Sequence, residues 1–267
     1  MTYCVGMRLE RGLVLMSDTR TNSGVDNIST FRKMAHWSIP GERQVAILSA
    51  GNLATTQAVI SLIEERTKAL SERRPSLLEA PTMFQVATVV GNLLRDTIGL
   101  RGRNVDAPSA STSSPSSTPP SSTPSFTASM IVAGQIKGSG PRLFMVYPEG
   151  NFIEASFDTP FFQIGETKYG RPILVRGYDR DMSFESAIKL MMVSFDSTLA
   201  ANLSVGLPLD LLVMERDRFE PLHDRRIMAD DPYFHRISTG WSTALRDAFH
   251  SLPDYHLDAP EQVDPVE

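Results

Sequence analysis

The chain has 267 residues, a formal net charge of −5 and a hydrophobic fraction of 41%, which is enough apolar material for a large core. The acidic balance argues against a nucleic-acid-binding protein, because such proteins usually carry a basic patch. Cys4 is the only cysteine, and there is neither a signal-peptide pattern nor an apolar run of about 18 residues, so we expect a cytoplasmic protein without disulfides or membrane contact.

The first fifty residues are predicted to form short antiparallel strands. Runs of β-branched and apolar residues are separated by turn formers such as those at 10–12 and 40–41, a spacing typical of hairpins. The expected strands are Thr2–Arg8, Leu13–Ser17, Phe31–Ile39 and Gln44–Ser49. The hydrophobic period then changes, which predicts helices over residues 53–70 and 82–100.

A polar insert divides the chain. Residues 109–125 consist only of Ser, Thr, Pro and Ala, and ordering them would cost entropy without burying apolar surface. We therefore predict a disordered insert over about 104–125. Because neither flank looks self-sufficient, we expect one domain over 1–253. A phosphorylated or partner-binding Ser/Pro tract is the alternative interpretation.

The second half of the chain is expected to add strands and one long helix. The predicted strands are 126–135, 142–147, 151–157, 161–165 and 209–215, and the helix spans 184–203. Residues 254–267 carry five acids and no Lys or Arg, which predicts a flexible tail. This order favours an α+β fold, with two antiparallel sheets stacked face to face and helices on the outside.

Thr2 directly follows the initiator methionine, whose removal is efficient before a small residue. The new terminus would carry a hydroxyl and an α-amine, and the unperturbed pKa of such an amine is about 7.7–8.0. A threonine hydroxyl reacts when a nearby base takes its proton, so an N-terminal threonine unites nucleophile and base in one residue. Because a threonine at position 2 is common, its meaning depends on its surroundings.

Three features are candidates for those surroundings. Asp18 closes the second strand, so a hairpin could bring it beside the start of the first. Lys33⁺ would lower the pKa of the Thr2 hydroxyl, and Asp18 would hold that lysine in place. The amide of Gly51, at the entry to the first helix, could donate to a tetrahedral oxyanion. Taken singly, Asp18 is more often a turn residue and Lys33 more often a surface charge.

Together these residues resemble a proteasome β-subunit, and in particular the bacterial homologues called Anbu (ancestral β-subunit). The resemblance rests on the N-terminal threonine, the Ser-Asp-Thr-Arg run at 17–20, the lysine about fifteen residues later and the Ala-Gly before the helix. It is strengthened by Thr-Tyr-Cys-Val-Gly at 2–6, Ser-Ala-Gly-Asn-Leu-Ala at 49–54 and Gly-Glu-Thr-Lys-Tyr-Gly at 165–170. It covers most of the chain, from Thr2 to about Glu215.

The resemblance implies an N-terminal nucleophile (Ntn) hydrolase fold, a four-layer αββα sandwich. It also implies cleavage of peptide or other amide bonds through an acyl-enzyme on Thr2, within a homo-oligomeric ring or open helical assembly. By the same resemblance, Asp196 and Ser204 would support the Thr2 amine. Ser49 would lie in the pocket for the residue that precedes the cleaved bond.

One departure from the family pattern keeps other functions open. Glu166 stands where a proteasome β-subunit has a serine, and its carboxylate could pair with the Thr2 ammonium or accept a peptide amine. A weakly active or inactive scaffold is therefore one alternative. An amidase acting on small non-peptide amides is another.

The remaining candidate groups point to no further chemistry. Cys4 is expected on the same side of its strand as Thr2, as a core side chain rather than a nucleophile. The five histidines share no ligand spacing, so we predict neither a metal site nor a cofactor. The glycine-rich segment 134–140 lacks the ending and the helix of a phosphate loop, which predicts a hairpin turn.

Overall fold

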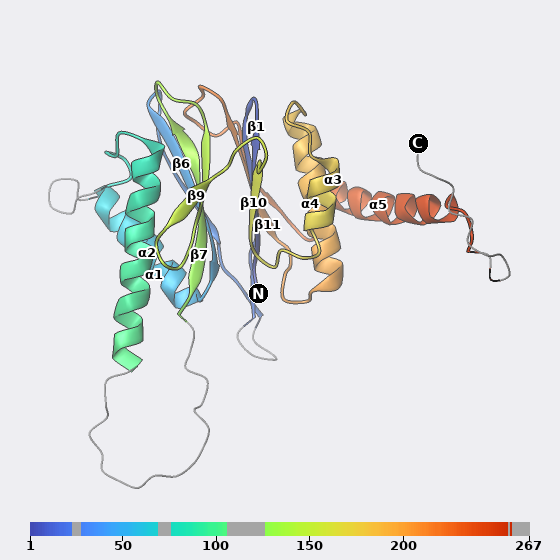
Figure 1. The fold of residues 1–267 in the computed structure, drawn as a ribbon, viewed down its shortest axis with the longest axis horizontal. Coiled ribbons are helices and arrows are strands. Elements are labelled where there is room, and N and C mark those ends of the chain that lie inside the picture. The colour runs from blue at the N-terminus through green and yellow to red at the C-terminus, as the bar shows by residue number, and fades with distance from the viewer. Residues whose placement is uncertain (23–27, 69–75, 106–125, 256, 258–267) are drawn as a thin grey trace, which may run out of the picture.

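The computed structural model describes residues 1–22, 28–68, 76–105, 126–255 and 257. Two five-stranded antiparallel sheets form its centre (Figure 1). The first has the order β10-β1-β2-β11-β12, with β1 at Tyr3–Leu9, β2 at Gly12–Asp18, β10 at Phe161–Gly165, β11 at Leu209–Glu215 and β12 at His223–Ile227. The second has the order β5-β6-β7-β8-β9, with β5 at Met34–Ile39, β6 at Arg43–Gly51, β7 at Ala128–Ile136, β8 at Arg142–Val146 and β9 at Phe152–Glu154.

Helices cover the outer face of each sheet. Helices α1 (Leu53–Lys68) and α2 (Met83–Val105) lie on the second sheet, and α3 (Arg171–Gly177) and α4 (Phe184–Ala201) lie on the first (Figure 1). A buried cluster that includes Cys4, Leu15 and Leu48 fills the space between the sheets. This arrangement confirms the predicted four-layer αββα sandwich of the Ntn-hydrolase type.

The layered arrangement explains why the central strands are buried. All but one of the β1 residues and all of the β2 residues are buried, because both faces of this sheet are covered. Side chains alternate between the faces. Tyr3 and Val5 belong to the cluster beneath α4, whereas Cys4 belongs to the cluster between the sheets. The expectation that Cys4 is a core side chain is therefore confirmed, and β7 and β8 likewise form the predicted hairpin.

Several elements differ from the sequence prediction. The short helix α3, the edge strand β12 and the hairpin of β3 (Arg20–Asn22) with β4 (Ile28–Thr30) were not predicted. Neither was α5 (Pro232–His250), a long helix that projects away from the α3/α4 layer (Figure 1). Its centre is rich in Ser, Thr and Gly, which have low helix propensity, although Asp231 and Pro232 form a regular helix start.

The predicted insert and tail fall largely outside the described residues. Helix α2 continues to Val105 and so overlaps the first residues of the insert predicted at about 104–125. Residues 106–125 and 258–267 are not among those that the structure describes. Within the described ranges, none of the helices is long and apolar enough to cross a membrane.

Candidate active site

The β1–β2 hairpin brings Asp18 to the N-terminus of the chain. Its register pairs Cys4 with Ser17, so Asp18 lies beside residues 2 and 3. The backbone N–H of Tyr3 donates to Asp18 Oδ1 at 2.9 Å, and the Asp18 side chain is fully buried. The convergence expected from the length of the hairpin is therefore present.

Lys33 reaches the same carboxylate from the segment that precedes β5. Its Nζ lies 2.8 Å from Asp18 Oδ1 and also donates to the Arg20 carbonyl at 2.5 Å and to the Met1 carbonyl at 3.4 Å. Lys33 is 6% exposed. A charge at this depth is stable only when it is paired and hydrogen-bonded, and here the contact with the Met1 carbonyl brings the ammonium to the first residues of the chain.

Burial has the largest effect on the pKa of the Asp18 carboxyl and on that of the terminal amine. It raises the pKa of the Asp18 carboxyl, while Lys33 and the amides of Tyr3 and Gly206 favour the charged carboxylate. The α-amine of Met1, the residue before Thr2, has a pKa below its usual value, because burial and the positive charge of Lys33 both disfavour the ammonium. The surroundings of the terminus thus favour a neutral amine.

The backbone of Thr2 is fixed from the other side by β10. Its carbonyl accepts a hydrogen bond of 2.7 Å from the Glu166 N–H, and β1 pairs Tyr3 with Gly165. Gly165 has φ +86°, and a Cβ there would lie 2.0 Å from the Thr2 carbonyl oxygen. Only glycine combines this backbone conformation with so close an approach.

The carboxylate of Glu166 has partners of its own. It accepts hydrogen bonds from the Lys168 N–H at 3.2 Å and from Asn202 Nδ2 at 3.1 Å, and the residue is 9% exposed. These contacts tie the end of β10 to the loop after α4. Among the described residues, no ion pair joins this carboxylate to the N-terminal amine.

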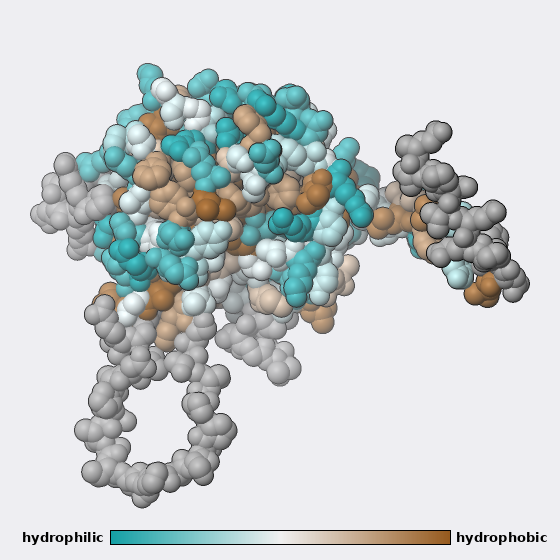
Figure 2. Space-filling model, in the orientation of Figure 1, coloured by the Kyte–Doolittle hydropathy of each residue, from teal (hydrophilic) through white to brown (hydrophobic). Residues whose placement is uncertain are grey.

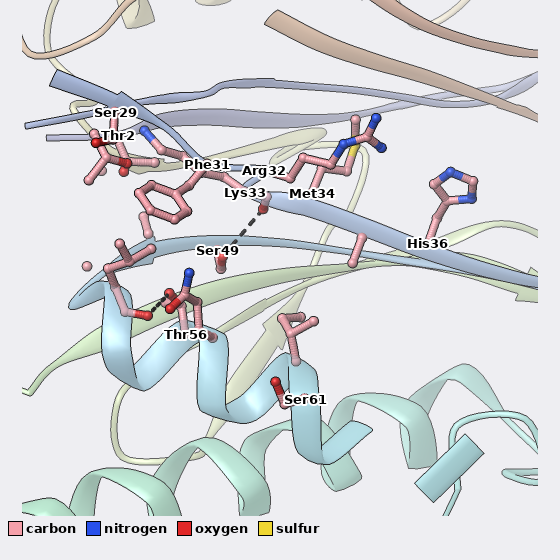
Figure 3. A pocket seen from close by; sticks show the side chains of 18 of the residues that line it. Thr2, Ser29, Phe31, Arg32, Lys33, Met34, His36, Ser49, Thr56 and Ser61 are labelled. Carbon is pink, nitrogen blue, oxygen red and sulfur yellow. Dashed lines mark hydrogen bonds between the residues drawn. The ribbon is translucent and has the colours of Figure 1, made fainter. Parts of the chain in front are cut away.

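Gly51 and Ser49 lie at the end of β6, beside the same site. Gly51 has φ +113°, and a Cβ there would lie 2.5 Å from the Thr127 carbonyl oxygen, so the turn into α1 requires glycine. Ser49 donates its N–H to the Lys33 carbonyl at 2.8 Å and its hydroxyl to the same oxygen at 3.4 Å (Figure 3). Ser49 thereby fixes the backbone that carries Lys33.

An open cavity of about 1140 Å³ runs from the N-terminus along β5 and α1. Thr2 and Phe31 lie at one end, and His36 lies at the other (Figure 3). Lys33, Ser49, Gly51 and Gly165 also contribute to the lining. The candidate nucleophile therefore faces a space large enough for a peptide-sized ligand.

A second set of contacts anchors Tyr3 below the site. The Tyr3 hydroxyl accepts from Gln163 Nε2 at 2.7 Å and lies 2.7 Å from Ser194 Oγ, which donates to the Gly170 carbonyl. The centroids of the Tyr3 and Phe195 rings lie 4.4 Å apart. Burial raises the pKa of the Tyr3 phenol to about 12. Because Tyr3 is adjacent to Thr2, this network fixes the backbone next to the candidate nucleophile.

Asp196 and Ser204 are linked to the N-terminal site less directly than Asp18 and Lys33 are. Asp196 is half-buried on α4, and within the described part of the chain no hydrogen bond or ion pair links it to Thr2, Asp18 or Lys33. Ser204 lies in the loop between α4 and β11, where its N–H donates to Asn202 Oδ1 at 3.0 Å.

The loop after α4, together with β3, supplies contacts that the sequence did not reveal. The Gly206 N–H donates to Asp18 Oδ2 at 3.4 Å, and Asn202 holds Glu166. The Arg20 carbonyl accepts from Lys33. Two of these three groups are backbone atoms, which have no signature in a sequence, and only the Asn202 side chain could have been singled out.

The Cys4 thiol and possible metal-ligand clusters were the remaining candidate groups. Burial strongly raises the pKa of the Cys4 thiol, and its Sγ lies 3.7 Å from the Ser49 carbonyl oxygen, so this thiol stays protonated. Within the ranges that the structure describes, no group of three His, Cys, Asp or Glu side chains could hold a metal ion.

Comparison with known proteins places this geometry in a family. A family model described as "Proteasome subunit" matches residues 107–208. The structure of a Gly-1 mutant of Anbu from Hyphomicrobium sp. strain MC1 is 49% identical, with a TM-score of 0.84 over 96% of this chain and 100% of that one. The chain belongs to the Anbu family of proteasome homologues.

Other relatives extend the comparison. An Anbu from Pseudomonas aeruginosa, solved as a helical assembly, is 42% identical with a TM-score of 0.84, over 96% of this chain and 98% of that one. A proteasome subunit beta from Methanocaldococcus jannaschii is 24% identical over 85% of this chain and 87% of its own length. Membership of the Anbu family confirms the resemblance and the fold.

Proposed function

We propose that this chain is an N-terminal-threonine hydrolase that cleaves peptide or other amide bonds after removal of Met1. The observation that carries this proposal is the buried Lys33–Asp18 pair, which points at the first residues of the chain beside an open cavity. A buried ion pair costs desolvation energy, and a functional role accounts for its position at the terminus.

Each neighbouring group has a defined role in the proposed reaction. The Thr2 hydroxyl oxygen attacks the amide carbonyl carbon, and the Thr2 amine takes the hydroxyl proton. Lys33 stabilises the developing alkoxide, Asp18 orients Lys33, and the Gly51 amide donates to the oxyanion. The C–N bond then breaks as the amine passes the proton to the leaving nitrogen, and water hydrolyses the ester on Thr2.

The outer residues have supporting roles in this proposal. Asp196 and Ser204 support the amine, Ser49 lines the pocket for the side chain before the cleaved bond, and Glu166 contacts the substrate or the amine. The half-buried position of Asp196 and the hydrogen-bonded carboxylate of Glu166 make these roles less direct than those of Lys33 and Asp18.

We also propose that the chain acts in the cytoplasm as a homo-oligomer, without nucleic-acid or membrane partners. The helical assembly of the Pseudomonas relative and its 42% identity support self-association. The acidic net charge of −5 supports the absence of a nucleic-acid partner.

The experiment is intact-mass analysis followed by reaction with a peptide epoxyketone, which forms a ring with the hydroxyl and the amine of an N-terminal threonine. The purified protein should lack Met1 and gain the mass of one probe. A Thr2→Ser variant should retain labelling, and a Thr2→Ala variant should lose it. Retention of Met1 would contradict the proposal, because the peptide bond would block the amine.

A weakly active or inactive scaffold is the second candidate function. Glu166 favours it, because its N–H binds the Thr2 carbonyl and the residue therefore adjoins the terminus. If its carboxylate turned from Asn202 toward the Thr2 amine, it would raise the pKa of the amine and weaken it as a base. A processed protein that assembles but takes up no probe would support the scaffold.

A further inference from the structure

The loop between α4 and β11 (residues 202–208) contacts two carboxylates of the site. Its Asn202 side chain donates to Glu166 at 3.1 Å, and its Gly206 N–H donates to Asp18 Oδ2 at 3.4 Å. The second contact lowers the pKa of the Asp18 carboxyl, which burial raises. The position of the loop therefore affects both acids beside the candidate nucleophile.

The side chain of Arg20, at the start of β3, holds the outer part of this loop. Its Nη1 donates to the Leu203 carbonyl at 3.1 Å. Leu203 is itself 86% exposed, so apolar packing does not fix this part of the loop. The guanidinium also lies against the backbone of Gly206, because a Cβ there would overlap Arg20 Cζ and Nε. Two contacts thus join Arg20 to the backbone that donates to Asp18.

Packing, rather than backbone conformation, accounts for the glycine at position 206. Unlike Gly51 and Gly165, Gly206 does not have a φ in the left-handed region that favours glycine. A side chain there would instead occupy the volume of the Arg20 guanidinium. The arginine and the glycine therefore form one fitted contact.

The backbone of Arg20 contacts the other half of the ion pair. Its carbonyl accepts from Lys33 Nζ at 2.5 Å, so the residue reaches Lys33 through its main chain and the donor to Asp18 through its side chain. Arg20 is not among the residues that line the cavity, which argues against direct contact with a substrate.

We propose that the Arg20 side chain is a positioning residue, which holds the loop at 202–208 against Asp18 and so aligns the Asp18–Lys33 pair with Thr2. The inference rests on the proposed threonine chemistry. It assigns to that reaction a side chain that lies outside the substrate cavity and acts through the backbone of a loop.

The loop keeps other anchors when the Arg20 side chain is removed. Val205 belongs to the buried cluster beneath α4, and Leu207 packs against that cluster. The Pro208 carbonyl accepts from the Thr19 hydroxyl at 2.7 Å. Loss of the Arg20 side chain should therefore shift the outer part of the loop and leave the chain folded.

The test compares two glycine variants that each place a Cβ against an arginine. Gly206→Ala displaces the Arg20 guanidinium. In the control, Gly140→Ala, the Cβ lies 2.9 Å from Arg216 Nη1, and Gly140 likewise lacks a left-handed φ. Arg216 contacts the Glu10 carbonyl, beyond the end of β1 that is opposite to the site. Arg20→Ala, alone and combined with Gly206→Ala, completes a double-mutant cycle.

We expect epoxyketone labelling to slow by about 10- to 100-fold in Gly206→Ala, because a small misplacement of the site reduces the rate strongly. Arg20→Ala and the double variant should slow equally, because all three lose the same contact. The rate at saturating probe should fall, and the probe concentration at half-maximal rate should stay unchanged. Gly140→Ala should match wild type. Losses that multiply in the double variant, or a change only in the half-maximal concentration, would overturn the proposal.

A small guanidine provides a chemical rescue. Because Arg20 is only half-buried, methylguanidine can reach the place of the missing side chain in Arg20→Ala. It should restore part of the labelling rate in this variant and none in the double variant, where the new Cβ occupies that place. Equal rescue of the two variants would show that the guanidinium does not act through Gly206.

Hydrogen exchange separates this inference from the proposed chemistry, because it needs no probe. Peptides that cover 202–208 should exchange faster in Gly206→Ala and Arg20→Ala than in wild type, and at the wild-type rate in Gly140→Ala. Unchanged exchange in all variants would overturn the role of Arg20. Faster exchange in variants of a wild type that takes up no probe would support Arg20 as the residue that holds the loop and remove the threonine chemistry.

Discussion

The N-terminal site and the outer half of helix α5 differ in the number of contacts that they make with the rest of the chain. The first three residues receive contacts from β2, from the segment before β5, from β10 and from α4, so the site is fixed by distant parts of the chain. The outer half of α5 is exposed along its whole length. The difference shows that contacts within one chain hold the site, whereas the outer half of α5 packs against little of its own chain (Figure 2).

The largest effect is expected from the ion pair, because it is the most deeply buried part of the site. Lys33→Met leaves the Asp18 carboxylate buried without its cation, and breaking such a pair costs about 3–5 kcal/mol of stability. We also expect probe labelling of Thr2 to slow by about 100- to 1,000-fold. Urea unfolding and labelling rates measure the two effects.

A double variant separates stability from chemistry. Lys33→Met with Asp18→Asn removes both charges and should recover much of the lost stability, while labelling stays slow. Recovery of labelling in the double variant would contradict the role given to Lys33.

The next effect concerns the glycine that touches Thr2. Gly165→Ala introduces a Cβ at 2.0 Å from the Thr2 carbonyl oxygen, and the matched variant Gly138→Ala has a similar φ, +88°, with no atom within 4 Å. Both variants incur backbone strain of about 1–3 kcal/mol. Only Gly165→Ala should lose further stability and Thr2 labelling, as measured by thermal unfolding and probe mass. Equal behaviour of the two variants would show that Thr2 is not held by this contact.

A smaller effect is expected from the network below the site. Tyr3→Phe keeps the ring on Phe195 and leaves Gln163 and Ser194 without the hydroxyl, which costs about 1–3 kcal/mol. Labelling should slow several-fold without a change in its pH profile, because Tyr3 acts by positioning. A shift of the pH profile in this variant would indicate a direct catalytic role.

The smallest effect is a shift in the pH dependence of labelling. Only the neutral Thr2 amine can accept the proton, so labelling should rise with pH through the pKa of that amine. Burial and Lys33 lower the pKa of the Met1 amine, and we expect the same groups to act on Thr2 after processing. The midpoint should therefore lie below the unperturbed value of about 8. A midpoint above this value would mean that Glu166 controls the amine.

The regular parts of the fold could be predicted from the sequence. Runs of β-branched and apolar residues between turn formers predicted most strands, and the position of Asp18 at the end of the second strand was enough to place it beside the terminus. Helix α5 was missed although its apolar residues recur at helical spacing, because Ser, Thr and Gly lower its helix propensity. The apolar residues of its outer half also have no core to bury them.

The outer contacts of the site could not be predicted in the same way. The Gly206 N–H contacts Asp18 across 188 residues of sequence, and it does so through a backbone atom. Such a contact depends on how the loop after α4 folds back onto β2. Side-chain chemistry can suggest that Lys33 and Asp18 pair, but it contains no information on which amides surround them.

Whether Thr2 is the nucleophile can be tested by locating the probe on the chain. Wild-type protein treated with the epoxyketone should be digested and its N-terminal peptide sequenced by tandem mass spectrometry. We expect a peptide that begins at Thr2, carries one probe on that residue and has an unmodified Cys4. A processed N-terminal peptide with an unmodified Thr2, or a probe on Cys4, would contradict the role of Thr2 as the nucleophile.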